Sequence, residues 1–201
     1  MNYNEYSKQA HETAVNHGFW KTKYSNEHFL MLVCTEIAEI IEADRKDRHA
    51  NVPLFLKFSP RAFEDGFKAH IKDTIEDEFA DTFIRLCDLA GELKVDFDKM
   101  LPCRYHRAFE RFSMTENAFG LIKGLSKGQI AVEKRIQFGL DYLVGWAKCN
   151  GINLEWHVKQ KMRFNQGRPG KGTERNIDSK TMHLHCICNP FAMHLHQKRR
   201  R

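Results

Sequence analysis

The sequence predicts an all-α fold, and three observations carry that prediction. Apolar residues recur at intervals of three and four along most of the chain, while the period-two alternation of strands is nearly absent. Capping and breaking residues stand where such helices would begin and end. The length of 201 residues suits one domain with an appendage. We therefore expect a helical bundle over residues 1–170 and a basic, poorly ordered tail over residues 171–201.

Capping residues and breakers set the expected helix boundaries. The first helix is expected over residues 4–17, ending at Gly18, and Ser25 or Asn26 starts a second helix that ends near residue 47. Residues 49–60 contain two prolines and are expected to form a loop. Residues 61–93 form one long helix, or a short helix that leads into a long one. Further helices are expected over residues 97–112, within 126–149, and over 154–166 behind an Asn153 cap.

Composition favours a cytoplasmic protein and argues against nucleic-acid and membrane partners. The net charge is +6, but four of the positive charges lie in the last four residues, so the body is nearly balanced. No stretch approaches the roughly 20 apolar residues of a membrane span. The first residues lack the basic and apolar regions of a secretion signal.

Cysteine and histidine residues gather near the C-terminus without a recognised metal-binding spacing. The tail contains His183, His185, Cys186 and Cys188, a density that can bind Zn²⁺. The spacing is not Cys-x-x-Cys, however, so we favour an extension without a zinc site. The cysteines also show no disulfide framework.

Two pairs of acids stand out within the helical pattern: Glu36-x-x-Glu39 and Glu78-x-x-Asp81. Each pair is spaced i,i+3, so both carboxylates project from one face of a helix. On both helices the first acid lies about 70° from the centre of the apolar stripe, and the second lies about 60° beyond it. If the two helices pack antiparallel, the pairs converge at the edge of one seam. The acids farther from the seam are expected to be surface charge: Glu42, Glu76, Asp77 and Asp88.

Four carboxylates in a helical core repel one another unless a cation joins them. An all-oxygen ligand set favours Mg²⁺, with Mn²⁺ as the alternative. A di-iron bundle would use Glu-x-x-His, which this sequence lacks. The competing interpretation is a solvated helix edge, the usual place for a glutamate. Two matched pairs in strong apolar stripes favour the metal site.

At these residues the chain resembles the MazG-like, all-α nucleoside triphosphate pyrophosphohydrolases. Their motif is E-x-x-E followed by E-x-x-D, and the flanks "TEIAEIIEA" and "EDEFADTFIRLCDLAG" are typical in kind. The segment "INLEWHVKQKMRFNQGRP" resembles their closing helix. The spacer over residues 40–77 is longer than is usual in that family, so an extra loop is expected there.

The resemblance implies an enzyme that hydrolyses a (deoxy)nucleoside triphosphate to the monophosphate and pyrophosphate, with Mg²⁺ as cofactor. Glu36, Glu39, Glu78 and Asp81 would hold the metal, and Glu36 or Glu39 would also orient the attacking water. The resemblance further implies a homodimer or homotetramer. Two alternatives stay open: a related phosphohydrolase specific for dUTP or phosphoribosyl-ATP, and a catalytically silent regulator that binds nucleotide or metal.

Basic, amide and aromatic side chains are expected to contact the substrate. The resemblance implies that Lys161 and Asn165, spaced i,i+4 on the closing helix, face it. Without the resemblance, Lys161 would be taken as an exposed helix lysine. Arg85, one turn after the second acid pair, either reaches a phosphate or balances the acids. Trp20 either stacks on the base or packs against the bundle, and Lys23 lies in the same aromatic and basic loop.

Overall fold

The computed structural model describes residues 1–101 and 108–168, and every regular element in these ranges is a helix. The predicted all-α fold is therefore confirmed, while the tail over residues 171–201, with its histidines and cysteines, lies outside the described residues. No described helix is both long and apolar enough to cross a membrane. The α-helices of the described ranges are α1 (Tyr3–Asn16), α2 (Asn26–Arg45), α3 (Val52–Phe55), α4 (Phe63–His70), α5 (Ile75–Glu92), α6 (Met114–Leu125), α7 (Val132–Cys149) and α8 (Leu154–Gln166).

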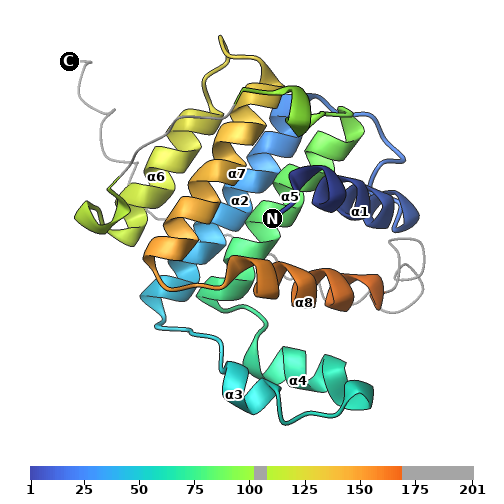
Figure 1. The fold of residues 1–201 in the computed structure, drawn as a ribbon, viewed down its shortest axis with the longest axis vertical. Coiled ribbons are helices and arrows are strands. Elements are labelled where there is room, and N and C mark those ends of the chain that lie inside the picture. The colour runs from blue at the N-terminus through green and yellow to red at the C-terminus, as the bar shows by residue number, and fades with distance from the viewer. Residues whose placement is uncertain (102–107, 169–201) are drawn as a thin grey trace, which may run out of the picture.

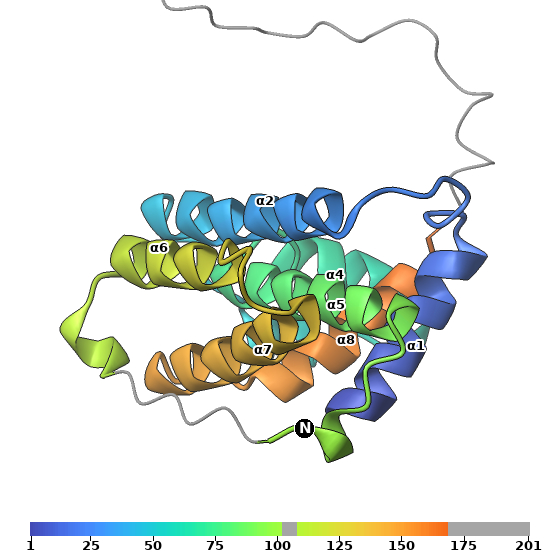
Figure 2. The same ribbon diagram turned by 90° about the horizontal axis from the view of Figure 1, so that it is seen from above.

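Helix α5 lies at the centre of the molecule and contacts α1, α2, α7 and α8. Helices α2 and α7 run alongside α5, α6 packs against α2 and α7, and α1 and α8 cross at one side of this bundle (Figure 1). Seen from above, α2 and α6 form one layer and α7 lies on the opposite side of α5 (Figure 2). The central helix, which carries the second acid pair, is therefore packed against four other α-helices.

Several helix ends lie where the capping residues predict them. The Ser25 hydroxyl accepts a hydrogen bond from the backbone N–H of His28 at the start of α2, and the Asn153 side chain accepts one from Trp156 at the start of α8. Gly18 follows α1 with a φ of 77°, which a glycine adopts without strain. These predicted boundaries are confirmed within one or two residues.

Two predictions of local structure are wrong, and one helix was not predicted. Residues 97–112 do not form a helix in their described parts, which contain only the 3₁₀ turns η2 (Phe97–Lys99) and η3 (Phe109–Arg111); Pro102 disfavours helical geometry at the residue before it. The expected loop over residues 49–60 contains α3, capped by the Asn51 side chain. Helix α6 was not predicted, although Ser113 and Glu116 form a capping box at its start.

The region over residues 61–93 follows the second alternative, a short helix and then a long one. Asp73, with a φ of 61°, lies in the break between α4 and α5. The long spacer between the acid pairs thus contains the small helices α3 and α4 as well as loop. They form a second apolar cluster with α8, in which the rings of Phe67 and Phe164 stack at 4.4 Å.

The main core surrounds α5. Phe79, Phe83 and Leu86 are fully buried there, together with Trp146 of α7 and Ile37 of α2. This packing fixes the rotation of α5 about its axis. Glu78 and Asp81 of α5 flank these apolar side chains, on the side where α5 meets α2 and α8.

Candidate metal centre and adjoining cleft

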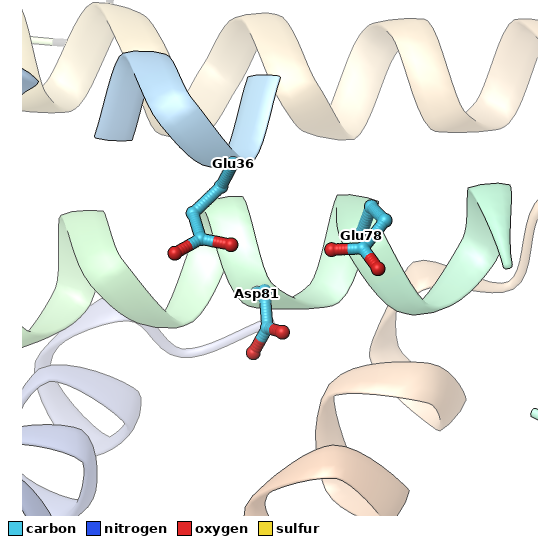
Figure 3. A group of neighbouring side chains, drawn as sticks. All are labelled: Glu36, Glu78 and Asp81. Atoms are coloured by element: carbon cyan, nitrogen blue, oxygen red, sulfur yellow. The ribbon is translucent and has the colours of Figure 1, made fainter. Parts of the chain in front are cut away.

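Three of the four predicted acids meet between α2 and α5. Glu36, Glu78 and Asp81 each offer a carboxylate oxygen, and these atoms lie within 4.8 Å of one another. Figure 3 shows Glu36 reaching from α2 toward α5, which carries the other two acids. Glu36 and Glu78 are buried, and Asp81 is half-buried. The shared seam that the i,i+3 spacing predicts is thus present for these three side chains.

Glu39, the fourth predicted acid, is exposed on α2 and does not belong to this group. Its charge nevertheless acts on the site, because it contributes to the raised pKa values of Glu36 and Glu78. The structure therefore places Glu39 at the rim of the acid group.

Burial raises the pKa of the Glu78 carboxyl to about 9, and the charges of Asp81 and Asp77 add to this effect. The Oε2 atom of Glu78 is buried and has no hydrogen-bond partner among the described residues. Burial also raises the pKa of Glu36, while the charge and the hydrogen bond of Arg85 act to lower it. A buried carboxyl with no donor needs either a proton or a cation, so the group is suited to binding a positive ion.

Two protein cations already contact these acids. The Lys161 Nζ atom lies 2.7 Å from Asp77 Oδ2 and 2.7 Å from Asp81 Oδ2, and the Arg85 Nε atom donates to Glu36 Oε1 at 2.7 Å. Burial opposes the charge of Lys161, but Asp81 and Asp77 outweigh it and raise the pKa of the lysine. Lys161 is 5% exposed, so the interpretation as a surface lysine is wrong.

The sequence reasoning missed Asp77, which was expected to be surface charge and is instead 1% exposed. Its carboxylate accepts hydrogen bonds from Lys161 and from the backbone N–H of Asp73. Asp77, Glu78 and Asp73 also offer oxygens within 4.8 Å of one another, so Glu78 is shared by two acid groups. The lysine on α8 explains why an acid on this face of α5 is buried.

A cleft of about 320 Å³ adjoins the acid group. Asp81 and Arg85 belong to both the cleft and the acid site. The other residues that line the cleft come from α1, the loop after α1, α5 and the end of α8. They are Ala10, Thr13, Ala14, His17, Phe19, Ile84, Asp88, Met162, Asn165 and Arg168.

The predicted substrate-binding residues divide into those at the cleft and those away from it. Asn165 lines the cleft, and its Oδ1 atom is buried without a hydrogen-bond partner in the described structure. Arg85 pairs with Glu36, as expected of a residue that balances the acids, and it also lines the cleft; its contact with a phosphate stays a prediction. Trp20 stacks on Phe29 at 4.2 Å outside the cleft, which favours packing over base stacking. Lys23 is exposed and does not line the cleft.

The sequence reasoning also missed Asp88, another acid expected to be surface charge. Its side chain is 17% exposed, and its Oδ1 atom accepts a hydrogen bond from Trp20 Nε1 at 2.9 Å. The same atom lies 3.0 Å from His11 Nδ1. Asp88 is seven residues after Asp81, almost two full turns, so the heptad spacing was the available signal that both acids share a face.

The donor set fits a hard divalent ion. Mg²⁺ and Mn²⁺ prefer carboxylate oxygens, and an octahedral ion at about 2.1 Å from each ligand places oxygens roughly 3 to 4 Å apart. The oxygens of Glu36, Glu78 and Asp81 lie within 4.8 Å of one another, so small side-chain movements would bring them to this spacing. Comparison with family models, curated proteins and solved structures finds no significant match to the chain. Inference about function therefore rests on the site and on the motif.

Proposed function

We propose that this chain is an Mg²⁺-dependent hydrolase that converts a nucleoside triphosphate to the monophosphate and pyrophosphate, with Mn²⁺ as the alternative ion. The observation that carries the proposal is the meeting of Glu36, Glu78 and Asp81 beside a cleft that also contains Arg85. Carboxylates repel a triphosphate directly but can hold the cation that it needs. The resemblance of the acid motif to MazG-like enzymes supports the same reaction.

Each side chain has a role that follows from its surroundings. Glu36, Glu78 and Asp81 hold the ion, which supplies charge neutralisation at the phosphates and acidifies water. Glu39 at the rim, or Glu36, accepts the proton of the attacking water. Arg85 is held against Glu36 at the cleft, where a guanidinium can pair with phosphate oxygens.

The closing helix α8 contributes two further groups. Lys161 holds Asp77 and Asp81 in fixed positions through its two 2.7 Å contacts, so it acts here as a positioning residue. The buried Oδ1 atom of Asn165 offers an acceptor to a sugar hydroxyl or a base N–H. The resemblance extends the proposal to a cytoplasmic homodimer or homotetramer.

A regulator that binds nucleotide or metal without turnover is the second candidate. The observation in its favour is the ammonium of Lys161, which already supplies positive charge to Asp77 and Asp81. In such a protein the lysine would take over part of the role of a divalent ion.

A turnover panel tests the proposal. Nucleoside triphosphates are incubated with the protein and Mg²⁺, and pyrophosphate and phosphate are measured separately. We expect pyrophosphate release, and a loss of about 100-fold or more in Glu78→Gln, because removing a metal ligand removes several kcal/mol of transition-state stabilisation. The matched control is Glu42→Gln, which changes an exposed acid of α2.

Full activity in Glu78→Gln would remove the metal assignment. Phosphate release without pyrophosphate would indicate a different phosphohydrolase. Tight binding of a nucleotide with no turnover of any substrate would favour the regulator.

A further inference from the structure

A second carboxylate, Asp88, lies at the cleft and away from the metal centre. Its Oδ1 atom contacts two ring nitrogens, Trp20 Nε1 at 2.9 Å and His11 Nδ1 at 3.0 Å. The Trp20 ring is in turn fixed by stacking on Phe29 and by an edge contact with His11. The Asp88 side chain therefore has a defined orientation, set by two neighbours that do not belong to the acid group.

The two contacts leave the second oxygen of Asp88 available. A carboxylate accepts through both oxygens and donates through neither when ionised. No hydrogen bond to Oδ2 is found among the described residues, and Asp88 lines the cleft. The cleft thus contains a fixed acceptor that the metal chemistry does not use.

We propose that Asp88 determines base specificity by accepting an N–H of an exocyclic amino group on the nucleobase, so that the cleft prefers bases that carry such a group. This inference rests on the proposed function and names its substrate class. It assigns cytosine, adenine or guanine nucleotides to the site, and disfavours uracil and thymine nucleotides.

The spacing along α5 supports this assignment. Asp88 follows Asp81 by seven residues, which is about 10.5 Å along the helix and about 20° from the same direction around it. Arg85 lies between them on the cleft wall. The cleft therefore has room for a nucleotide with its phosphates at Asp81 and Arg85 and its base at Asp88. Ile84 and Met162 provide apolar wall for the ring.

The chemistry of the base edges supplies the selectivity. Cytosine and adenine present an amino donor where uracil and thymine present a carbonyl oxygen. A carbonyl placed against the Asp88 carboxylate brings two acceptors together without a proton between them. A site whose acceptor faces the amino group of the base disfavours an analogue without that group, because the acceptor then loses its donor. We expect a preference of at least about tenfold, since one such hydrogen bond contributes roughly 1–3 kcal/mol.

The test uses pairs of substrates that differ at the amino position. We expect kcat/KM to be at least about tenfold higher for dCTP than for dUTP, and for dGTP than for dITP. The Asp88→Asn variant should shrink or reverse the ratio, because its amide can donate to a carbonyl. Asp65→Asn, which changes an exposed acid of α4, is the matched control and should leave the ratio unchanged.

A binding measurement makes the test independent of turnover. Calorimetric titration with dCMP and dUMP in EDTA should show the same preference for the amino-bearing member, and its loss in Asp88→Asn. Circular dichroism confirms that the variant is folded. A merely structural role of Asp88 would weaken both ligands equally, whereas recognition changes their ratio.

The outcomes separate the inference from the proposed function. Equal kcat/KM within each pair, or an unchanged ratio in Asp88→Asn, overturns the role of Asp88 while turnover itself upholds the hydrolase. A preference for dCMP that Asp88→Asn abolishes, without turnover of any triphosphate, supports Asp88 and overturns the hydrolase. Absence of both turnover and nucleotide binding overturns both.

Discussion

Replacing Glu78 with Gln should make the metal-free protein more stable at neutral and alkaline pH, although it disables the proposed site. The wild-type carboxyl is 4% exposed, its Oε2 atom has no partner among the described residues, and nearby acids oppose its ionisation. A glutamine has a similar shape and carries no charge. The substitution therefore removes an electrostatic penalty that the folded state carries for the sake of the site.

The raised pKa of Glu78 fixes the sign and the pH range of this effect. Its ordinary value of 4.5 rises to about 9 in the folded protein, mainly because of burial. The contribution of the Glu78 carboxyl to the free energy of unfolding is fully present below pH 4.5. It is lost as pH rises toward 9, because this carboxyl ionises in the unfolded chain at lower pH than in the folded protein. Each pH unit above 4.5 lowers the free energy of unfolding by about 1.4 kcal/mol, so at pH 7.5 the loss of stability is at most about 4 kcal/mol.

The stabilisation expected from Glu78→Gln is smaller than this limit of about 4 kcal/mol. The glutamine amide introduced at this position would leave a buried polar atom unpaired, which costs roughly 1–3 kcal/mol. A net gain of about 1–3 kcal/mol remains, which corresponds to a rise of about 2–12 °C in Tm for a chain of this size.

Thermal unfolding in EDTA, followed by circular dichroism at pH 5 and pH 8, measures the effect. Glu78→Gln should exceed the wild type at pH 8, and the difference should vanish or reverse at pH 5. The control Glu42→Gln should follow the wild type at both values, because an exposed acid contributes little. A Glu78→Gln protein less stable than the wild type at pH 8, or a difference independent of pH, would refute the reasoning.

Three further changes have expected outcomes. Lys161→Met should lower the free energy of unfolding by about 3–5 kcal/mol in urea titrations, because it leaves Asp77 buried and unpaired; a loss under about 1 kcal/mol would contradict the buried ion pair. Gly91→Ala should destabilise the protein by roughly 1–3 kcal/mol in the same assay, despite better helix propensity, because its Cβ would lie 2.4 Å from His11 Cβ; a stabilised variant would contradict the close packing of α1 on α5. Tyr142→Phe should cost about 1 kcal/mol in thermal unfolding, because its buried hydroxyl donates to the backbone carbonyl of residue 117 at 2.7 Å; an unchanged Tm would contradict that hydrogen bond.

Local signals predicted much of the fold. Ser25 and Asn153 are side-chain caps, and Gly18 adopts the positive φ that follows a helix, so each acts within a few residues of its own position. The acid pairs were found because i,i+3 spacing is also local. The helix α6 could have been found by its Ser113 and Glu116 capping box, which is the same kind of signal.

The rest depends on contacts between distant segments. Asp77 lies off the seam of α2 and α5, and only the approach of α8 with Lys161 explains its burial. The orientation of Asp88 is fixed by a hydrogen bond from Trp20, which lies in the loop after α1. The sequence prediction considered only how two acid-bearing helices pack together. It could not find Lys161 and Trp20, because each lies on a third element whose position is set by the packing of the core.

The proposed metal site depends on Glu36, Glu78 and Asp81 holding a divalent ion together. Calorimetric titration of Mg²⁺ and Mn²⁺ into the protein tests this most directly. We predict saturable binding that tightens from pH 6 to pH 9, because Glu78 must lose its proton to bind. Binding should be lost in Glu36→Gln and retained in Glu42→Gln. Absence of saturable binding, or equal affinity in Glu36→Gln and the wild type, would contradict the metal site and the hydrolase proposed from it.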